Sequence, residues 1–414
     1  MTDTGPMPLL DRDRIRELFD LRGSFLSFTG GDHTDDPYPV WHARREEAPV
    51  HEGTLHALTG FEGEAFWHGL PYPDAPHFTA FSWEAVDAAH RNDAVFSSTP
   101  FDQGVGVLNS MLTMGGAEHR RYRALVQPSF MPAKARWWIE RWIEATVHGL
   151  IDSFVEDGRA ELNVDFCAAI PILTITGSFG IPVEQALDIR ASMHEPGKLA
   201  DAIAELVALR RDDPQDDLIT VLLEAELADE DGTTHRLTDE EIQGFASLLL
   251  TAGSGTTWKQ MGITLAALLQ RPQVLEAVSA DRSLLRGAIE ESVRWMPTDP
   301  MFSRWVMEDV DLCGTAIPGG SVVHLCLGSA NRDPARWVDP DEFDVWRALK
   351  PSVGFGGGPH ICLGMHVARA EMAVGIGALL DRLPNLRLDP DREPPQAIGL
   401  YERGVTAIPV AFDA

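Results

Sequence analysis

One cysteine of this chain, Cys362, lies between a run of glycines and the expected start of a helix, in the stretch GFGGGPHICLGMHVARAE. A thiolate is a soft, electron-rich ligand for metals. Glycines beside it let backbone N–H groups approach the sulfur, and the start of a helix favours negative charge there. The pattern therefore favours a thiolate that ligates a metal. From these residues alone, a buried structural cysteine is the alternative.

The other three cysteines, Cys167, Cys313 and Cys326, lie in apolar segments. The chain has no CxxC pair, which is the spacing typical of zinc sites and redox pairs. We therefore predict neither a disulfide framework nor a structural zinc site. We expect these three cysteines to fill the core.

A second segment that could do chemistry, AGSGTT, lies inside a long apolar stretch. Residues 237–270 predict one buried helix, with Thr238 as its N-cap and Glu241 at capping-box spacing. A glycine inside a helix costs about 1 kcal/mol relative to alanine. Hydroxyl side chains that bond back to the preceding turn can bend the helix and open it to a ligand or water. Close packing against small residues is the alternative.

The composition limits the class of protein. The chain has 414 residues, of which 44% are hydrophobic, and a net charge of -29. Such an acidic surface argues against nucleic acid as the main partner, because phosphate repels it. The N-terminus has no basic segment followed by an apolar run, and the apolar runs are too short to span a bilayer. We therefore expect a cytoplasmic protein that does not bind membranes.

Helical periodicity dominates the chain, and we find no internal repeat and no low-complexity linker. The pattern predicts one domain over residues 1–414, with a β-containing part at about 1–80 and an α-rich part at about 81–414. Amphipathic helices are expected at 83–95, 118–127, 136–156, 183–207, 214–229, 281–296 and 365–382. Short strands are expected near 48–58, 76–82, 303–325 and 402–412. The fold class is therefore mainly α with small β-sheets, and many helices surround one buried helix.

The spacing F-x-x-G-x-x-x-C-x-G around Cys362, with His360 two positions before it, resembles the haem-binding loop of the cytochrome P-450 family, in its bacterial soluble type. EESVRW resembles the E-x-x-R pair of that family, and EHRRYR its H-x-x-x-R helix. AGSGTT falls at the central oxygen-activating helix. The segment before the cysteine also matches, at Asn331, Arg332, Asp333, Pro334, Phe343 and Arg347.

The resemblance implies a cytochrome P-450 fold with a buried haem b (iron protoporphyrin IX) and Cys362 as the iron ligand. It implies a monooxygenase that inserts one oxygen atom from O2 into a medium-sized hydrophobic substrate, such as a terpenoid, a steroid or a fatty-acid derivative. Electrons would come from a separate ferredoxin and ferredoxin reductase. The alternatives are a peroxide-using or otherwise atypical haem-thiolate enzyme, and a non-catalytic haem-thiolate binding or sensor protein.

The resemblance also implies roles for individual residues. Thr256 and Ser254 are the expected catalytic residues. A buried haem needs cationic or hydrogen-bonding partners for its propionates, and the other cofactor-binding residues border the ring. The expected cofactor-binding residues besides Cys362 are His119, Arg123, Arg304, His360, Phe355, Gly356, Gly364 and Ala252. A network of Glu291, Arg294 and Arg347 is expected to support the loop.

At one position the chain departs from the family. Most members carry an acid before the key threonine, where this chain has Gly255. One explanation is that water is ordered by Ser254 and Thr256, with help from a carboxylate elsewhere, such as Asp299 or Glu402. The other is that the enzyme activates oxygen less than its relatives do.

The substrate side departs from the family as well. The lid between GIPVEQ and ALRRDDPQDDL is short, and residues 53–78 are long for a hairpin. These residues could close the substrate mouth, or they could be a plain surface loop. The expected substrate lining is residues 101–112, Leu249, Ala252, Thr298 to Phe302 and Ile398 to Tyr401. The expected cations for docking a ferredoxin are Arg120, Arg121 and Arg369, which could also be ordinary surface charges.

Overall fold

The computed structural model describes residues 11–21, 36–60, 74–99, 110–193, 195–228 and 232–413. The helices are α1 (Arg12–Leu18), α3 (Tyr38–Glu47), α4 (Leu55–Thr59), α5 (Trp83–Arg91), α6 (Gly116–Phe130), α7 (Ala135–Trp138), α8 (Glu144–Asp152), α9 (Ala169–Ser178), α10 (Ala186–Ser192), α11 (Pro196–Asp212), α12 (Leu218–Glu224), α13 (Asp239–Leu269), α14 (Pro272–Ala280), α15 (Leu284–Trp295), α16 (Leu327–Ala330) and α17 (Met365–Arg382). The strands are β1 (Val50–Glu52), β2 (His77–Ala80), β3 (Phe96–Ser97), β4 (Arg159–Glu161), β5 (Glu226–Ala228), β6 (Thr234–Arg236), β7 (Met301–Val306), β8 (Val310–Leu312), β9 (Thr315–Ile317), β10 (Val322–Cys326), β11 (Arg387–Leu388), β12 (Ala397–Ile398), β13 (Gly404–Val405) and β14 (Pro409–Ala411).

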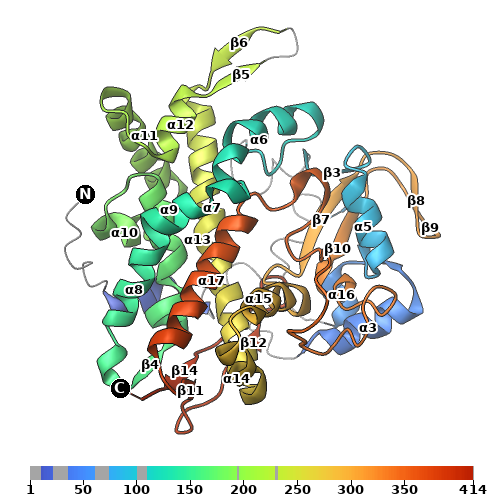
Figure 1. Cartoon of the computed structure of the whole chain (residues 1–414). Coiled ribbons are helices and arrows are strands. Elements are labelled where there is room, and N and C mark those ends of the chain that lie inside the picture. Colours follow the sequence, from blue (N-terminus) through green and yellow to red (C-terminus); the bar gives the residue numbers. More distant parts are fainter. Residues whose placement is uncertain are drawn as a thin grey trace.

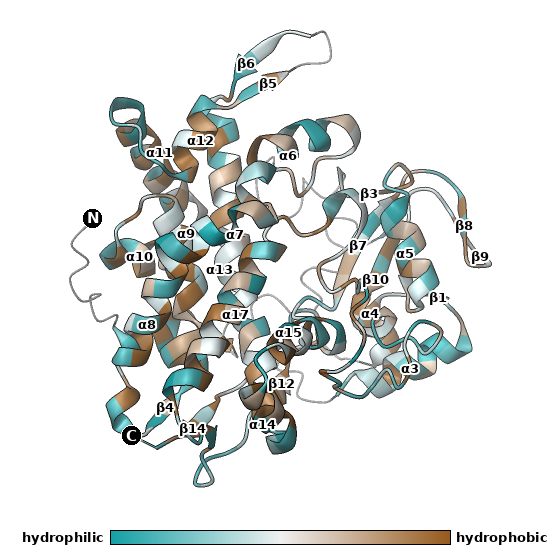
Figure 2. Cartoon of the chain, in the orientation of Figure 1, coloured by the Kyte–Doolittle hydropathy of each residue, from teal (hydrophilic) through white to brown (hydrophobic). Residues whose placement is uncertain are grey.

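The fold is mainly α with small sheets, as predicted (Figure 1). The helices α8, α9, α13 and α17 lie on one side of the view, and β7 and β10 lie with α3 and α5 on the other. The outer helices carry both hydrophobic and hydrophilic residues, as amphipathic helices do (Figure 2). Among the helices that the structure describes, none is long and apolar enough to cross a membrane.

The buried central helix that the sequence predicts is α13. The Thr238 side chain accepts a hydrogen bond from the Glu241 N–H, and the Glu241 carboxylate accepts one from the Thr238 N–H, which completes the capping box. Most of α13 is buried, and it packs against α9, α11, α15 and α17. Neighbours on several sides explain why its sequence is apolar around most of its circumference.

The largest sheet has the strand order β1-β2-β10-β7-β3. β2 and β10 are parallel, whereas the other neighbouring strands are antiparallel. β10 is buried along its whole length, as a covered central strand should be. The register pairs Val323 of β10 with Arg304 of β7, and Arg304 belongs to the site described below.

The predicted charge network is present at the end of α15. Arg294 donates two hydrogen bonds of 2.7 Å to the Glu291 carboxylate, and the Arg347 Nε donates to the same carboxylate at 3.1 Å. Arg294 also donates to the carbonyl oxygens of Asn331 and Pro340. Its side chain is 2% exposed. The network therefore fixes the segment before the cysteine by bonds that satisfy a buried charge.

Some local predictions were wrong. The helix expected at 183–207 is broken into α10 and α11, because Pro196 begins a new helix. The helix expected at 214–229 ends at Glu224 and gives way to the hairpin β5–β6. Cys167 and Cys326 are buried as expected, whereas Cys313 is only partly buried beside the β8–β9 turn. Residues 61–73, at the centre of the proposed mouth-closing segment 53–78, lie outside the described residues.

Candidate active site

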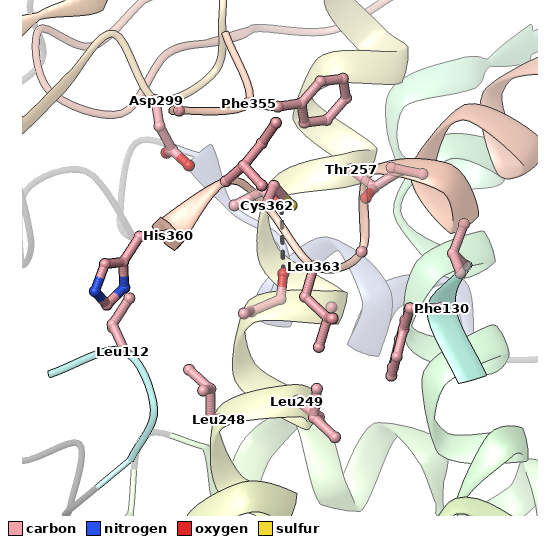
Figure 3. Close-up of a pocket in the computed structure, with 18 of the residues that line it drawn as sticks. Leu112, Phe130, Leu248, Leu249, Thr257, Asp299, Phe355, His360, Cys362 and Leu363 are labelled. Atoms are coloured by element: carbon pink, nitrogen blue, oxygen red, sulfur yellow. Dashed lines mark hydrogen bonds between the residues drawn. The ribbon is translucent and has the colours of Figure 1, made fainter. Parts of the chain in front are cut away.

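A cavity of about 360 Å³ lies between α13 and residues 354–364, which we call the cysteine loop. Its walls are mostly apolar. Further lining residues come from α5, α6, α7, α9, α15, α17 and β7. Figure 3 shows Asp299 and His360 on one side of Cys362 and Phe130 on the other, with Leu248, Leu249 and Thr257 on α13.

The shape of the cysteine loop depends on its glycines. The Cys362 N–H donates to the Phe355 carbonyl oxygen at 2.8 Å, which closes the loop before α17 begins. Gly358 has a φ of +61°, and a Cβ there would lie 1.9 Å from the carbonyl oxygen of His90 on α5. Only glycine fits at this position, since both the backbone angle and the contact exclude a side chain.

The Cys362 thiol lines the cavity. Burial raises its pKa, and this exceeds the opposing effects of a hydrogen bond from the Gly364 backbone and of nearby Arg123 and Arg369. The protein alone therefore does not hold a thiolate here. A positive ligand on the sulfur would supply the missing stabilisation.

Next to the cysteine loop, imidazole and guanidinium groups gather at one edge of the cavity. The rings of His119 and His360 stack with their centroids 3.9 Å apart, and the Arg123 Nη2 donates to the Ile361 carbonyl oxygen at 2.6 Å. Arg304 also lines this edge. We call His119, Arg123, Arg304 and His360 the cationic edge.

Among the described residues, no carboxylate forms an ion pair with the cationic edge, although Asp93 lies near enough to His119 to act on its charge. Burial lowers the pKa of Arg304 to about 10. Burial, followed by neighbouring positive charge, lowers the pKa of His119 to about 4. The pKa of His360 falls to about 3, through burial and then the nearby His119 and Arg304. Such a group of donors is suited to bind a buried anionic substituent.

The α13 wall carries Ala252, Gly253, Thr256 and Thr257. The Thr256 hydroxyl donates to the Ala252 carbonyl oxygen at 3.3 Å, which is the back-bonding expected of a hydroxyl inside a helix. Thr256 therefore stands at the cavity, on the wall that faces Cys362.

Ser254, in contrast, does not reach the cavity. It is completely buried, and its Oγ lies 3.4 Å from the Thr251 carbonyl oxygen and 3.3 Å from the Met193 sulfur. Two residues along a helix turn the side chain by about 200°, so Ser254 and Thr256 point to different faces. The structure does not bring the two expected catalytic residues together.

Gly255 leaves free space where the usual acid would be. A Cβ at this position would meet no atom within 4 Å. One turn further along α13, the Lys259 Nζ donates to the Glu402 carboxylate in a largely buried ion pair. The carboxyl of Asp299 lines the cavity, and its pKa is raised to about 7 by burial and then by Glu402, against an opposing effect of Lys259.

Three titratable residues of this site were missed by sequence reasoning. They are His90 and Glu371, which line the cavity, and Lys259. Lys259 could have been found, because a lysine in a helix that is apolar on most sides needs a buried partner. His90 and Glu371 lie on ordinary amphipathic helices and gave no signal.

The other predicted residues divide between the cavity and elsewhere. Phe355, Gly356 and Gly364 line the cavity, as do Leu112, Leu249, Thr298 and Phe302. Ile398 to Tyr401 do not line it, and the Tyr401 hydroxyl instead lies 3.1 Å from His56 Nδ1. Residues 101–109 of the predicted lining lie outside the described ranges.

Of the cations considered for ferredoxin docking, Arg120 is exposed, whereas Arg121 is partly buried. Arg369 forms an ion pair with Glu290, in which Nη2 and Oε2 are 2.9 Å apart. Of the three, Arg120 is therefore the most accessible to a partner.

Known proteins resemble this chain over almost its whole length. The family model for Cytochrome P450 matches residues 188–405. The Cytochrome P450 monooxygenase PikC of Streptomyces venezuelae is 33% identical over 94% of each chain. The Biotin biosynthesis cytochrome P450 of Bacillus subtilis (strain 168) is 30% identical, over 87% of this chain and 93% of that one.

Solved structures agree in fold. P450BioI in complex with an acyl carrier protein ligated to hexadec-9Z-enoic acid has a TM-score of 0.79 and 26% identity, covering 94% of this chain and 100% of that one. The post-tailoring hydroxylase HmtN, which is involved in himastatin biosynthesis, has a TM-score of 0.78 and 28% identity, covering 91% of this chain and 96% of that one. The cysteine loop, the central helix and the cavity between them thus occur in a chain that belongs to the cytochrome P450 family.

Proposed function

We propose that this enzyme is a haem-thiolate monooxygenase that uses O2 to oxidise a medium-sized hydrophobic molecule. The observation that carries the proposal is the position of Cys362 on one wall of the cavity and Thr256 on the facing wall. Membership of the family implies a haem cofactor. We further propose that this cofactor is haem b. A cytoplasmic location of the protein stays a prediction.

The residues around the cavity fit a haem. The ring would occupy largely apolar space, and the cationic edge holds Arg304, which lines the cavity and forms no ion pair with a carboxylate among the described residues. Two haem propionates would supply the missing negative charge. When bound, the haem supplies an iron that binds O2 and accepts electrons, and a thiolate ligand promotes cleavage of the O–O bond.

We assign the roles of the chain's own residues accordingly. Cys362 would ligate the iron, and Arg123, Arg304, His119 and His360 would hold the propionates. The cofactor-binding residues proposed for the ring are Phe355, Gly356, Gly364 and Ala252. The four residues proposed for the propionates and the four proposed for the ring all line the cavity, as Cys362 does, which supports the assignment.

Thr256 is proposed to hold a proton-carrying water at its Oγ1, next to the place where oxygen reacts. Its position on the cavity wall supports this role. Ser254 is not proposed again, because its hydroxyl points to Met193. Thr256→Ala should lower the product formed per NADH consumed, and an unchanged ratio would contradict the role of Thr256.

The substrate class follows from the apolar lining. Leu112, Leu248, Leu249 and Phe302 offer contact area without charge. Two further structures support this class: CYP267B1 in complex with myristic acid, at 27% identity and a TM-score of 0.77, and CYP109E1 with testosterone, at 26% and 0.78. We propose a fatty-acid derivative, steroid or terpenoid as substrate, and a ferredoxin with its reductase as the electron source.

A peroxide-using enzyme is the second candidate, and Gly255 favours it, because a missing acid weakens proton delivery from solvent. NADH consumption with a ferredoxin and an NADH-dependent ferredoxin reductase, compared with turnover on hydrogen peroxide, separates the two candidates. A protein that consumes neither NADH nor hydrogen peroxide would instead fit a non-catalytic haem binder.

Spectra test the shared part of both proposals. The reduced protein with carbon monoxide should show the red-shifted Soret band of a thiolate-ligated haem, and a pyridine haemochrome spectrum should identify haem b. Addition of myristic acid or testosterone should shift the ferric haem from low to high spin if either fits the cavity. A carbon monoxide spectrum of the histidine-ligated kind would overturn the assignment of Cys362.

A further inference from the structure

The reaction proposed above consumes protons inside a largely apolar cavity. Its balance is RH + O2 + 2 H⁺ + 2 e⁻ → ROH + H2O, in which the ferredoxin supplies the electrons and one oxygen atom leaves as water. An apolar wall cannot supply protons, so a titratable group must stand at the cavity and be recharged from solvent. Gly255 removes the usual position for such a group on α13.

The described residues that line the cavity include two carboxyls, those of Asp299 and Glu371. Glu371 is sealed, since it is 3% exposed and lies beside Thr174, which is completely buried. Burial raises the pKa of Glu371 to about 8. A carboxyl with no exposed neighbour could release one proton but could not regain it quickly from solvent.

Asp299, in contrast, lies near charged groups that extend toward the surface. Its carboxyl interacts with the ion pair between Lys259 and Glu402. Lys259 is 4% exposed, whereas the Glu402 side chain is 27% exposed, so the pair extends from the buried side of α13 toward solvent. The charged groups that act on Asp299 are Glu402 and Lys259, and Asp299 in turn raises the pKa of Cys362.

We propose that Asp299 is the proton donor of this cavity and takes the place of the acid that is missing at Gly255, with Lys259 and Glu402 as positioning residues. This inference rests on the proposed function. The three residues come from three parts of the fold. Asp299 lies between α15 and β7, Lys259 lies on α13, and Glu402 lies in the turn between β12 and β13.

The path conserves every proton. Asp299 gives the proton on its carboxyl oxygen to water held by Thr256, and that proton enters the reaction. The resulting Asp299 carboxylate then regains a proton from solvent, on the side where the Lys259–Glu402 ion pair extends toward the surface. The Lys259 ammonium keeps the Glu402 side chain beside α13. Two passages supply the two protons of each turnover.

Infrared difference spectroscopy of the haem-loaded enzyme tests the donor without any turnover. A band of a protonated carboxyl should titrate near neutral pH and disappear in Asp299→Asn. Glu402→Gln removes a negative charge and should move this titration to lower pH, whereas Lys259→Met removes a positive charge and should move it to higher pH. If no band near neutral pH is assigned to Asp299, or if both variants leave its midpoint in place, the proposal is wrong.

Turnover gives a second test, with Glu371→Gln as the matched control. With a saturating ferredoxin and an NADH-dependent ferredoxin reductase, Asp299→Asn should slow NADH oxidation by about 100-fold, the lower end of what a positioned acid contributes. Loss of activity in Glu371→Gln together with normal rates in Asp299→Asn would overturn the proposal. The carbon monoxide spectrum of each variant confirms that it is folded and haem-loaded.

Failure of this inference can be told apart from failure of the proposed function. Hydrogen peroxide brings both protons with it, in RH + H2O2 → ROH + H2O, so Asp299→Asn should oxidise 7-ethoxycoumarin with peroxide as fast as the unchanged enzyme does. An unchanged enzyme that oxidises neither NADH nor the coumarin contradicts the proposed function. An enzyme that oxidises NADH equally fast with and without Asp299 contradicts this inference alone.

Discussion

The cysteine loop and the α13 wall face each other across one cavity, but their polar groups come together in different ways. The loop supplies Phe355, His360 and Cys362 from a single short segment. The charged group at the α13 wall consists of Lys259, Asp299 and Glu402, which are far apart in the chain. The residues of one wall therefore form a local motif of the sequence, whereas those of the other are assembled by tertiary packing.

The largest effect expected on the loop wall is that of Cys362→Ala. Loss of the sulfur should abolish oxidation and remove the thiolate signature from the carbon monoxide spectrum, because no other cysteine lines the described cavity. Cys313→Ser is the matched control, since Cys313 lies beside the β8–β9 turn. A thiolate spectrum that survives in Cys362→Ala would show that another residue ligates the iron.

The support of the loop wall should be the next most sensitive feature. Glu291→Gln leaves Arg294 and Arg347 without their shared carboxylate and should reduce the free energy of unfolding by about 3–5 kcal/mol. Urea unfolding of the haem-loaded protein measures this. Glu47→Gln, in the exposed pair with Arg44, should cost about 1 kcal/mol or less. Equal losses in both variants would mean that the buried network does not support the loop.

The α13 wall can be rebuilt to sharpen the comparison. Gly255→Glu places a carboxyl where a new Cβ meets no atom within 4 Å. In an Asp299→Asn enzyme it should recover roughly tenfold of the lost NADH oxidation, because a positioned acid is restored. Gly255→Gln in the same enzyme, which has similar size but no titratable group, should recover nothing. Equal recovery by both would assign the effect to helix stability rather than to proton donation.

The smallest expected effect concerns acid stability of the loop wall. The pKa of His119 is lowered from 6.5 to about 4, first by burial and then by Arg123. Below pH 6.5 the unfolded chain binds this proton, whereas the folded protein binds it only near pH 4. The free energy of unfolding should therefore decrease as the pH is lowered from 6.5 to 4.

His119→Gln should make that fall shallower, as urea unfolding at a series of pH values would show. His148→Gln, at an exposed position, is the control for the substitution itself. A slope that His119→Gln does not alter would place the acid sensitivity elsewhere.

The same contrast explains what could be predicted from the sequence. The capping box of α13 and the Glu291–Arg294 pair are contiguous, so their geometry follows from spacing alone. The residues of the cysteine loop could also be identified from their spacing, but not the contact of the loop with α5. The helical phase that turns Ser254 away from Thr256 could also have been deduced from the sequence. In contrast, the ion pair of Lys259 with Glu402 depends on how the β12–β13 turn packs on α13, and no local pattern specifies that.

The boundaries of the elements failed where two local tendencies competed. The amphipathic pattern of 183–207 runs through Pro196, but proline prefers the first turn of a new helix. At 214–229 the helical pattern continues past Glu224, and strand pairing of β5 with β6 replaces it. Periodicity identifies an amphipathic segment but does not determine where that segment is interrupted.

The contact between Gly358 and the His90 carbonyl oxygen has a consequence for the order of assembly. The cysteine loop takes its shape against α5, which lies near the beginning of the chain, so a nascent chain cannot complete the loop by local folding. Contacts of such long sequence separation form late, because closing the intervening chain costs entropy. We therefore expect cofactor insertion to follow docking of α5 and not to guide it.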